Sequence, residues 1–336
     1  MPNQPKTAKK TDTNRTMEDL AALAGVSSIT VSRALRNSPL VTEKTREKIQ
    51  QIAEAQGYRL NLSARNLRLR SSYSIAVVVE MTPAKDRPMS GSYPLELLGG
   101  ITQELTSAGY SAVLTSKQLI NTSPVQGADG IILLGQGSHG EALKEIQKCG
   151  LPLLVWGAPH KDFTCIVVGS DNYAGGASVA EYFLADGRKK FLFLGDINHA
   201  EIEQRYLGFE HIVAQSGWQV EKMQPTAFTF EAGYDCLLQQ LQAPNFPFDG
   251  IFAASDLLAM GAIRALTEHG LDIPKQVSVV GYDDIPSAAS FVPPLTSVHQ
   301  YLHDGGVLLA KKILSLIQGE HVESEMLPTL LVKRET

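Results

Sequence analysis

The segment EDLAALAGVSSITVSRAL, residues 18–35, decides the fold of the first part of this chain. Apolar residues at helical spacing lead to Gly25, which can adopt the positive φ that a tight turn between two helices requires. Just upstream, the sequence TMED has the form of a capping box, with Thr16 as the N-cap and Asp19 returning to the backbone. The segment therefore predicts a helix-turn-helix arrangement that begins at Thr16.

Two further helices are expected after the turn. Ser27 can cap a second helix that runs through Arg36, and a third helix is predicted from Thr42 to the stop at Gly57. Three short helices with this turn are typical of a DNA-binding domain, which we place at residues 15–60. The same arrangement also occurs in proteins that bind no DNA.

The second helix carries side chains suited to reading DNA. Arg33 can donate two hydrogen bonds to guanine, and Ser28 and Ile29 can meet a base edge or a thymine methyl group. Five polar residues suit phosphate contacts: Thr16, Ser27, Thr30, Ser32 and Asn37. Residues 1–70 contain 13 Lys and Arg against six Asp and Glu, whereas the rest of the chain has a net charge of −12. A basic head on an acidic body is expected if only the head meets a polyanion.

A basic segment with regularly placed leucines follows this domain. Residues 61–70, NLSARNLRLR, are too few to form a stable helix alone. We expect them to fold only on DNA, as part of a hinge over residues 61–72, with Leu67 wedged between base pairs in the minor groove. A solvated basic linker is the alternative. Residues 1–14 are polar and are predicted to form a disordered basic tail.

From residue 73 onward, short apolar runs alternate with helical stretches. Eight runs have this character: residues 75–79, 112–114, 130–134, 153–155, 165–168, 191–194, 250–253 and 277–280. Runs without alternating polar residues indicate strands covered on both faces, hence parallel sheets in a doubly wound α/β arrangement.

Eight strands exceed one small sheet, so we expect two similar α/β subdomains with a ligand cleft between them. The first is placed at about residues 73–171 and 299–321, and the second at about 172–298 and 322–336.

Several classes of protein find no support in the sequence. Cys149, Cys165 and Cys236 form no CxxC pair, so neither a disulfide framework nor a metal site is expected. No secretory signal is recognisable, and no apolar run approaches the ~18 residues of a membrane span. We therefore expect a cytoplasmic protein rather than a periplasmic solute receptor.

One motif points in a different direction. Gly135, Gly137 and Gly140 form a literal GxGxxG, a pattern typical of dinucleotide binding. However, this motif follows roughly the third strand instead of opening the first βαβ unit. An enzyme that does not bind DNA would also leave the basic charge of residues 1–70 unexplained. The eight histidines are dispersed, and neither HExxH nor GxSxG occurs. A non-enzymatic protein without a cofactor is expected, although a catalytic pair assembled by folding stays open.

Seven segments resemble successive signatures of one family. In chain order they are VSSITVSRALRNSPLVTEKTREKI, GYRLNLSARNLR, GSDNYAGG, RYLGFE, FAASDLLAMGAIRAL, VSVVGYDDIPSA and PPLTSVHQ. They resemble the LacI/GalR family of sugar-responsive repressors from Met17 to the last residues. The resemblance implies a homodimer on a near-palindromic operator, paired hinge helices that insert Leu67, and an effector-binding core like that of periplasmic sugar-binding proteins.

The same resemblance implies which residues face the effector. Arg205 and Asp256 correspond to an effector-holding pair, and a guanidinium with a carboxylate suits vicinal hydroxyls because each offers two bonds in fixed geometry. An internal salt bridge between them is the alternative. Four more residues are placed at the cleft: Asn172 and Asp283 at strand ends, Phe228 (or its neighbour Phe230) against a sugar ring, and Tyr93 in the first strand–helix loop. For each aromatic residue, a place in the core or at the interface of the subdomains is the alternative.

Two departures from the family pattern bear on these expectations. Leu60 stands where the family usually has proline, and the stretch 110–129 looks too short for the usual second helix, which puts the details of the dimer surface in doubt. No leucine heptads follow the last strand, which favours a dimer over a tetramer. The effector is expected to be a mono- or disaccharide, with a gluconate-like acid or a nucleobase as alternatives. The sequence does not indicate whether it induces or corepresses.

Overall fold

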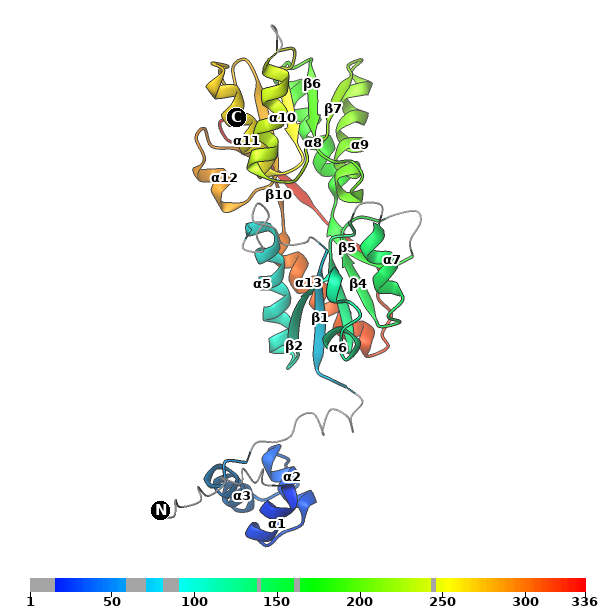
Figure 1. The fold of residues 1–336 in the computed structure, drawn as a ribbon, viewed down its shortest axis with the longest axis vertical. Helices are drawn as coiled ribbons and strands as arrows, with labels where there is room; N and C mark the ends of the chain where they lie inside the picture. Colours follow the sequence, from blue (N-terminus) through cyan, green and yellow to red (C-terminus); the bar gives the residue numbers. More distant parts are fainter. Residues whose placement is uncertain (1–15, 59–70, 81–90, 138–139, 160–163, 243–245) are drawn as a thin grey trace, which may run out of the picture. The chain divides into compact units, whose positions relative to one another are not determined.

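In the computed structural model the chain divides into two compact units, residues 1–70 and 71–336. The structure describes residues 16–58, 71–80, 91–137, 140–159, 164–242 and 246–336. In the first unit, three helices pack around a small apolar core (Figure 1). They are α1 (Met17–Ala24), α2 (Ser28–Leu35) and α3 (Glu43–Ala55). The core includes Leu20, Ala24, Val31, Ala34, Ile49 and Ala53.

The sequence signals at the helix ends form the predicted contacts. The Thr16 N–H donates to the Asp19 carboxylate at 2.8 Å, and the Asp19 N–H donates to the Thr16 hydroxyl at 3.3 Å. Gly25 has a φ of 71°, which a residue with a Cβ rarely adopts. The Ser27 hydroxyl accepts from the Thr30 N–H at 3.2 Å and so begins α2. The predicted helix-turn-helix is therefore present.

The first subdomain of the second unit is built on a parallel sheet with the order β11-β5-β4-β3-β1-β2. Its strands are β1 (Ser74–Val79), β2 (Ser111–Ser116), β3 (Gly130–Leu134), β4 (Leu153–Trp156), β5 (Ile166–Ser170) and β11 (Glu325–Leu327). Alternate residues of β1 point to opposite faces: Ile75 and Val77 pack with α5 (Ser92–Ser107) and α13 (Leu302–Ile317), whereas Ala76 packs on the side of α7 (Glu141–Gln147).

The second subdomain has a sheet with the order β12-β10-β9-β8-β6-β7, in which only the β10–β12 pair is antiparallel. Its strands are β6 (Phe191–Leu194), β7 (Val220–Met223), β8 (Gly250–Ala253), β9 (Ser278–Asp283), β10 (Thr296–Gln300) and β12 (Thr329–Val332). Its helices are α8 (Asn172–Ala185), α9 (Ala200–Gln215), α10 (Phe230–Leu241), α11 (Asp256–Glu268) and α12 (Pro286–Ser290). Helices cover both faces of each sheet, as the apolar runs predicted (Figure 1).

The chain passes between the two sheets three times: between β5 and α8, between β10 and α13, and between β11 and β12. The last crossing differs from the expected boundary near residue 321. Glu325 lies opposite Val168 in a parallel pair, and its carboxylate meets the Lys312 ammonium at 2.8 Å. Residues 325–327 thus add an edge strand to the first sheet before the chain returns to the second.

The segment between β2 and β3 is too short for the usual second helix of the subdomain, as its length predicted. It contains only a turn of 3-10 helix (Lys117–Leu119) and the four-residue helix α6 (Ser123–Gln126). Ile120 and Val125 are buried against the sheet and replace the cover that a longer helix would provide. No helix in the described part of the chain is long and apolar enough to cross a membrane.

Candidate DNA interface and effector site

Helix α2 presents the predicted base-reading residues to solvent. Ile29 is 64% exposed and Arg33, one turn further along, is also exposed. Val31 and Ala34 on the opposite face are fully buried and fix the helix on the core of the first unit. An exposed isoleucine adds nothing to this core, so its position is consistent with an apolar contact to a base.

The residues predicted to contact phosphates are exposed or partly exposed: Thr16, Ser27, Thr30, Ser32 and Asn37. Some of them also have structural contacts. The Ser27 hydroxyl lies 2.9 Å from the Thr30 hydroxyl, and the Asn37 carboxamide oxygen accepts from the Gln50 amide at 2.9 Å. Their contacts with DNA phosphates stay predictions, and so does the contact of Ser28 with a base edge.

The predicted hinge, residues 61–72, falls outside the described residues except for its last two, Ser71 and Ser72, which bond to the Asp129 carboxylate of the second unit. Leu67 and Leu60 lie in the segment 59–70, and the predicted tail at residues 1–14 also lies outside the described part.

Arg205 is the best-defined residue of the candidate effector site. It lies on α9, is only 4% exposed, and donates from Nε to the Asn172 carboxamide at 2.8 Å and from Nη1 to the Ala254 carbonyl at 2.6 Å. Its guanidinium carbon lies 3.7 Å from the centre of the Tyr282 ring. Asn172 and Arg205 are therefore brought together, as expected, and the guanidinium is fixed before any ligand arrives.

Two glycines explain why α8 and α9 place these side chains so close. A Cβ on Gly176 would lie 2.0 Å from the backbone oxygen of Arg205, and a Cβ on Gly208 would lie 2.0 Å from that of Tyr173. Only glycine allows this approach of the two backbones, which brings Asn172 within reach of Arg205.

Asp283 ends β9 in a strained turn. Its φ is 112° and that of Asp284 is 55°, and a non-glycine residue held in such a region costs about 1–3 kcal/mol. The Asp283 carboxylate accepts from the Gln300 amide at 2.6 Å. Burial raises the pKa of Asp283 to about 7, against the opposing effects of the Arg205 charge and the Gln300 hydrogen bond. A strained backbone and a carboxyl pKa raised toward neutrality together indicate a functional position.

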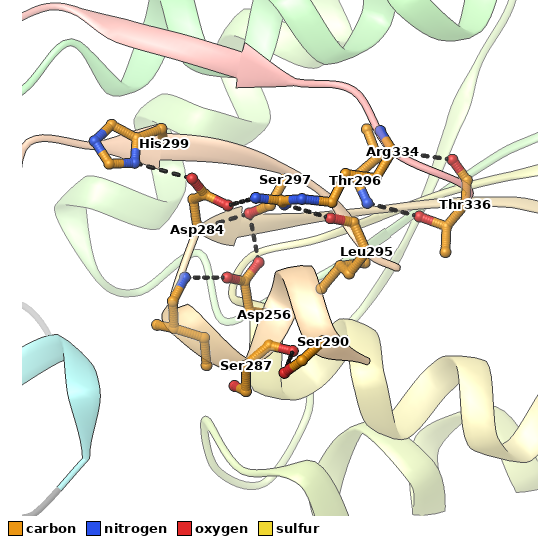
Figure 2. Close-up of polar contacts among 11 residues, drawn as sticks. Asp256, Asp284, Ser287, Ser290, Leu295, Thr296, Ser297, His299, Arg334 and Thr336 are labelled. Carbon is orange, nitrogen blue, oxygen red and sulfur yellow. Dashed lines mark hydrogen bonds and ion pairs between the residues drawn. The ribbon is translucent and has the colours of Figure 1, made fainter. Parts of the chain in front are cut away.

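Asp256 is engaged by neighbouring groups of its own subdomain. It is 0% exposed, and its two oxygens accept from the Ser297 hydroxyl at 2.5 Å and from the Ile285 N–H at 2.8 Å (Figure 2). The salt bridge with Arg205 that was the alternative is not seen in the described residues. Burial and the neighbouring Asp283 charge raise the pKa of Asp256 well above its usual range. In this structure Asp256 holds the turn that carries Asp283, and a direct contact with effector stays a prediction.

The C-terminal strand segment reinforces that turn. Arg334 donates to the Asp284 carboxylate at 2.6 Å and to the Leu295 carbonyl at 2.6 Å, and His299 lies 3.0 Å from the other Asp284 oxygen (Figure 2). The carboxylates of Asp283 and Asp284 thus have different partners. Asp284 is tied to its own subdomain, whereas Asp283 is the carboxylate whose pKa the Arg205 charge lowers.

Tyr93, on α5 of the first subdomain, faces these charges. Its hydroxyl accepts from the Trp156 indole N–H at 2.8 Å. Burial raises the pKa of Tyr93, and the charges of Glu201 and Asp283 raise it further, whereas Arg205 lowers it. A first-subdomain hydroxyl therefore lies near the charged groups of the second, as expected for a shared site.

Phe228 has the alternative environment considered for it. Its ring packs against the core of the second subdomain and lies 5.3 Å from the His199 ring, edge to face. Phe230 also packs against this core. Stacking of either ring on a ligand stays a prediction.

A cavity of about 300 Å³ borders Asp283, at the boundary of the subdomains. It is lined by Glu96, residues 283–286 and residues 299–304, and so draws on both subdomains. Arg205 is not part of its wall. No group of three or more His, Cys, Asp or Glu side chains within the described ranges could hold a metal ion.

Sequence reasoning missed three residues that organise the site. The Tyr282 ring packs against the guanidinium of Arg205. Ser170 and Gln300 are joined by a 2.7 Å hydrogen bond. Ser170 is the last residue of β5, so a polar residue closing an apolar run was the available signal for it, whereas Gln300 ends β10, which is not an apolar run and gave no such signal.

These features define a class: a helix-turn-helix DNA-binding regulator with a periplasmic-binding-protein-like core. Residues 16–61 match the family described as bacterial regulatory proteins, lacI family, and residues 180–336 match a periplasmic binding protein-like domain. The chain thus has a lacI-family helix-turn-helix domain followed by a periplasmic-binding-protein-like domain. It is a DNA-binding transcription regulator and not an enzyme.

Relatives and solved structures agree along most of the chain. The chain is 29% identical over 322 residues to the probable HTH-type transcriptional repressor ExuR of Bacillus subtilis (strain 168), covering 92% of this chain and 94% of the relative. PurR of Haemophilus influenzae (strain PittEE), an HTH-type transcriptional repressor, is 28% identical over 303 residues, with coverages of 85% and 86%. The lac repressor dimer bound to operator and the anti-inducer ONPF superposes with a TM-score of 0.85 at 25% identity, covering 96% of this chain and 98% of that one. A complex of the transcriptional regulator CelR with cellobiose has a TM-score of 0.71 at 27% identity, with coverages of 96% and 99%.

Proposed function

We propose that this regulator binds operator DNA as a homodimer, and that a small polyhydroxylated ligand bound between its subdomains changes its affinity for that DNA. The observation that carries the proposal is the buried Arg205, held by Asn172 and Ala254 and stacked on Tyr282. A guanidinium fixed in advance donates to neighbouring hydroxyls with little further loss of side-chain freedom. The Asp283 carboxylate supplies the acceptor.

The ligand class proposed is a neutral mono- or disaccharide. Hydroxyl groups both donate and accept, and therefore suit a guanidinium and a carboxylate in one site. The neighbour CelR holds cellobiose, which supports a sugar. The proposed contacts are Tyr93, Asn172, Arg205, Phe228 and Asp283, with Asp256 supporting the turn from behind.

On DNA, we place Ser28, Ile29 and Arg33 in the major groove and Leu67 at the central minor-groove step. The relatives ExuR and PurR are named repressors, so we infer a repressor, and the ligand class suggests genes of carbohydrate use. Such a protein acts where the chromosome lies, in the cytoplasm.

Switching requires only that the ligand bind one subdomain arrangement better than the other. The chain crosses between the subdomains three times, and both Ser170 and Gln300 end strands at such crossings. A ligand that contacts Arg205 and Tyr93 joins the two subdomains and thereby favours one arrangement. By linkage, DNA must then alter ligand affinity by the same factor.

Two measurements on the full-length protein test this function. Selection from a random duplex library, followed by gel shifts, should yield a near-palindromic site bound far more tightly than unrelated DNA. Thermal shifts with glucose, cellobiose, gluconate and adenine should single out one class, since a ligand at 100 times its Kd adds about 2.7 kcal/mol of stability. Equal affinity for all duplexes would overturn the DNA assignment, and a shift with adenine alone would overturn the sugar assignment.

A further inference from the structure

A continuous chain of buried hydrogen bonds connects the two charged groups of the proposed effector site. Arg205 donates to the Asn172 carboxamide oxygen at 2.8 Å, and the Asn172 amide donates to the Ser170 carbonyl at 3.0 Å. The Ser170 hydroxyl donates to the Gln300 carboxamide oxygen at 2.7 Å, and the Gln300 amide donates to Asp283 at 2.6 Å. Ser170 and Gln300 are 2% and 3% exposed. Buried networks of this kind fix the orientation of their members.

This series of hydrogen bonds includes residues at two of the three places where the polypeptide crosses between the subdomains. Ser170 is the last residue of β5 and Gln300 the last of β10, so each lies where the polypeptide leaves one sheet for the other. The two ends of the Gln300 carboxamide have different partners. Its oxygen accepts from the hydroxyl of Ser170, which lies at the neighbouring crossing. Its N–H donates to Asp283, the candidate acceptor for the ligand.

We propose that Gln300 is a positioning residue of the effector site, which holds the Asp283 carboxylate toward Arg205 and ties it through Ser170 to the neighbouring crossing. This inference rests on the proposed function, because Asp283 matters only if it accepts from a ligand. A change in the angle between the subdomains moves the crossings. It therefore disturbs the Gln300 contacts and with them the acceptor that the ligand uses.

The electrostatics of Asp283 give the proposal a specific consequence. Burial raises the pKa of Asp283 to about 7, and both the Arg205 charge and the Gln300 hydrogen bond hold it down. Other ionisable groups around it are Asp256, Asp284 with its partners His299 and Arg334, Tyr93 and Tyr282, and across the adjoining cavity lie Glu96, His303 and Asp304. Without the Gln300 donor, the pKa of Asp283 should rise by about one to two units, the equivalent of one hydrogen bond to a charged group.

The first test follows Asp283 itself and requires no ligand. Carboxyl carbon NMR of the full-length protein labelled at aspartate, with Asp283→Asn to assign the signal, should show a midpoint near pH 7. Gln300→Met keeps the length of the side chain and removes both hydrogen bonds, and should move the midpoint to about 8–9. Gln136→Met is the matched control, because Gln136 is 2% exposed and both ends of its carboxamide bond to the backbone of Ala158, away from Asp283. An unchanged midpoint in Gln300→Met would overturn the proposal.

The second test uses cellobiose as the probe, by calorimetry between pH 6 and 9.5. At pH 7.5 Gln300→Met should bind roughly tenfold more weakly than the wild type, because most of its Asp283 is protonated, and should recover near pH 9.5. A loss that persists at high pH would mean a merely structural role and would contradict the proposal. If cellobiose binds neither protein, the sugar assignment fails while the carboxyl titration still decides the role of Gln300. Gln300→Glu, which keeps the acceptor for Ser170, should also raise the midpoint and replaces the Met variant if that fails to fold.

Discussion

Replacing Asp283 by asparagine should stabilise the ligand-free protein at neutral and alkaline pH. The pKa of Asp283 rises from 3.8 to about 7 on folding. A group whose pKa is raised in the folded state stabilises the protein fully below its unfolded pKa, and this stabilisation is lost as the pH climbs through the folded pKa. Three pH units correspond to at most about 4 kcal/mol, reduced by whatever solvent reaches the carboxylate. Asparagine tolerates positive φ and can still accept from Gln300.

Denaturant unfolding between pH 4 and 8.5, followed by fluorescence, measures this effect. Both tryptophans, Trp156 and Trp218, lie in the unit that holds Asp283. The free energy of unfolding of Asp283→Asn, relative to the wild type, should rise by about 2–4 kcal/mol from pH 4 to pH 7 and then stay level. Asp304→Asn, at a side chain 70% exposed, is the matched control for the amide substitution. A difference that does not depend on pH would refute the reasoning.

Three further substitutions test other parts of the account. Arg33→Ala should lower discrimination at one base pair of the operator by about 1–3 kcal/mol in gel shifts, and equal weakening on all DNA would contradict base reading. Leu67→Ala should lower operator affinity while leaving ligand affinity unchanged, and unaltered operator affinity would rule out the wedge. Asp256→Ala leaves the Ile285 N–H and the Ser297 hydroxyl without their acceptor and should lower the free energy of unfolding by about 2–5 kcal/mol; a loss below 1 kcal/mol would contradict its structural role.

Local signals made the first unit and most of the sheets predictable. The Thr16 capping box and the Gly25 turn act through neighbouring residues, so the sequence alone identifies them. The eight apolar runs correspond to eight strands, and most of them are buried on both faces and so need no polar alternation. β2 is the exception, an edge strand in which Leu114 is 54% exposed.

Three strands that are polar or short were missed, β7, β10 and β11, whereas β12 lies in the C-terminal stretch LPTLLVKRET, where the last strand was expected. β10 lies inside its sheet, but its buried Thr296 and Ser297 are satisfied by Thr336 and Asp256, partners that no local pattern shows.

The site residues were predictable only through the motifs that carry the family resemblance. Asn172 and Arg205 meet because α8 and α9 approach closely through Gly176 and Gly208. Asp256 was expected at the ligand from its position in the motif FAASDLLAMGAIRAL. Its actual partners, Ser297 and Ile285, are 41 and 29 residues away, so its role depends on tertiary structure. Gln300 escaped notice for a similar reason.

The central claim is that ligand held by Arg205 controls the affinity for DNA. It is tested most directly by operator affinity of the full-length protein with and without the ligand that the thermal-shift panel identifies. In the wild type, saturating ligand should change the Kd for operator by about 5–150-fold, in one direction. Arg205→Lys keeps the charge but loses the paired donors, so it should bind operator like the wild type and show little response to the same ligand. A variant that responds as the wild type does, or a wild type whose Kd is unaffected, would contradict the account.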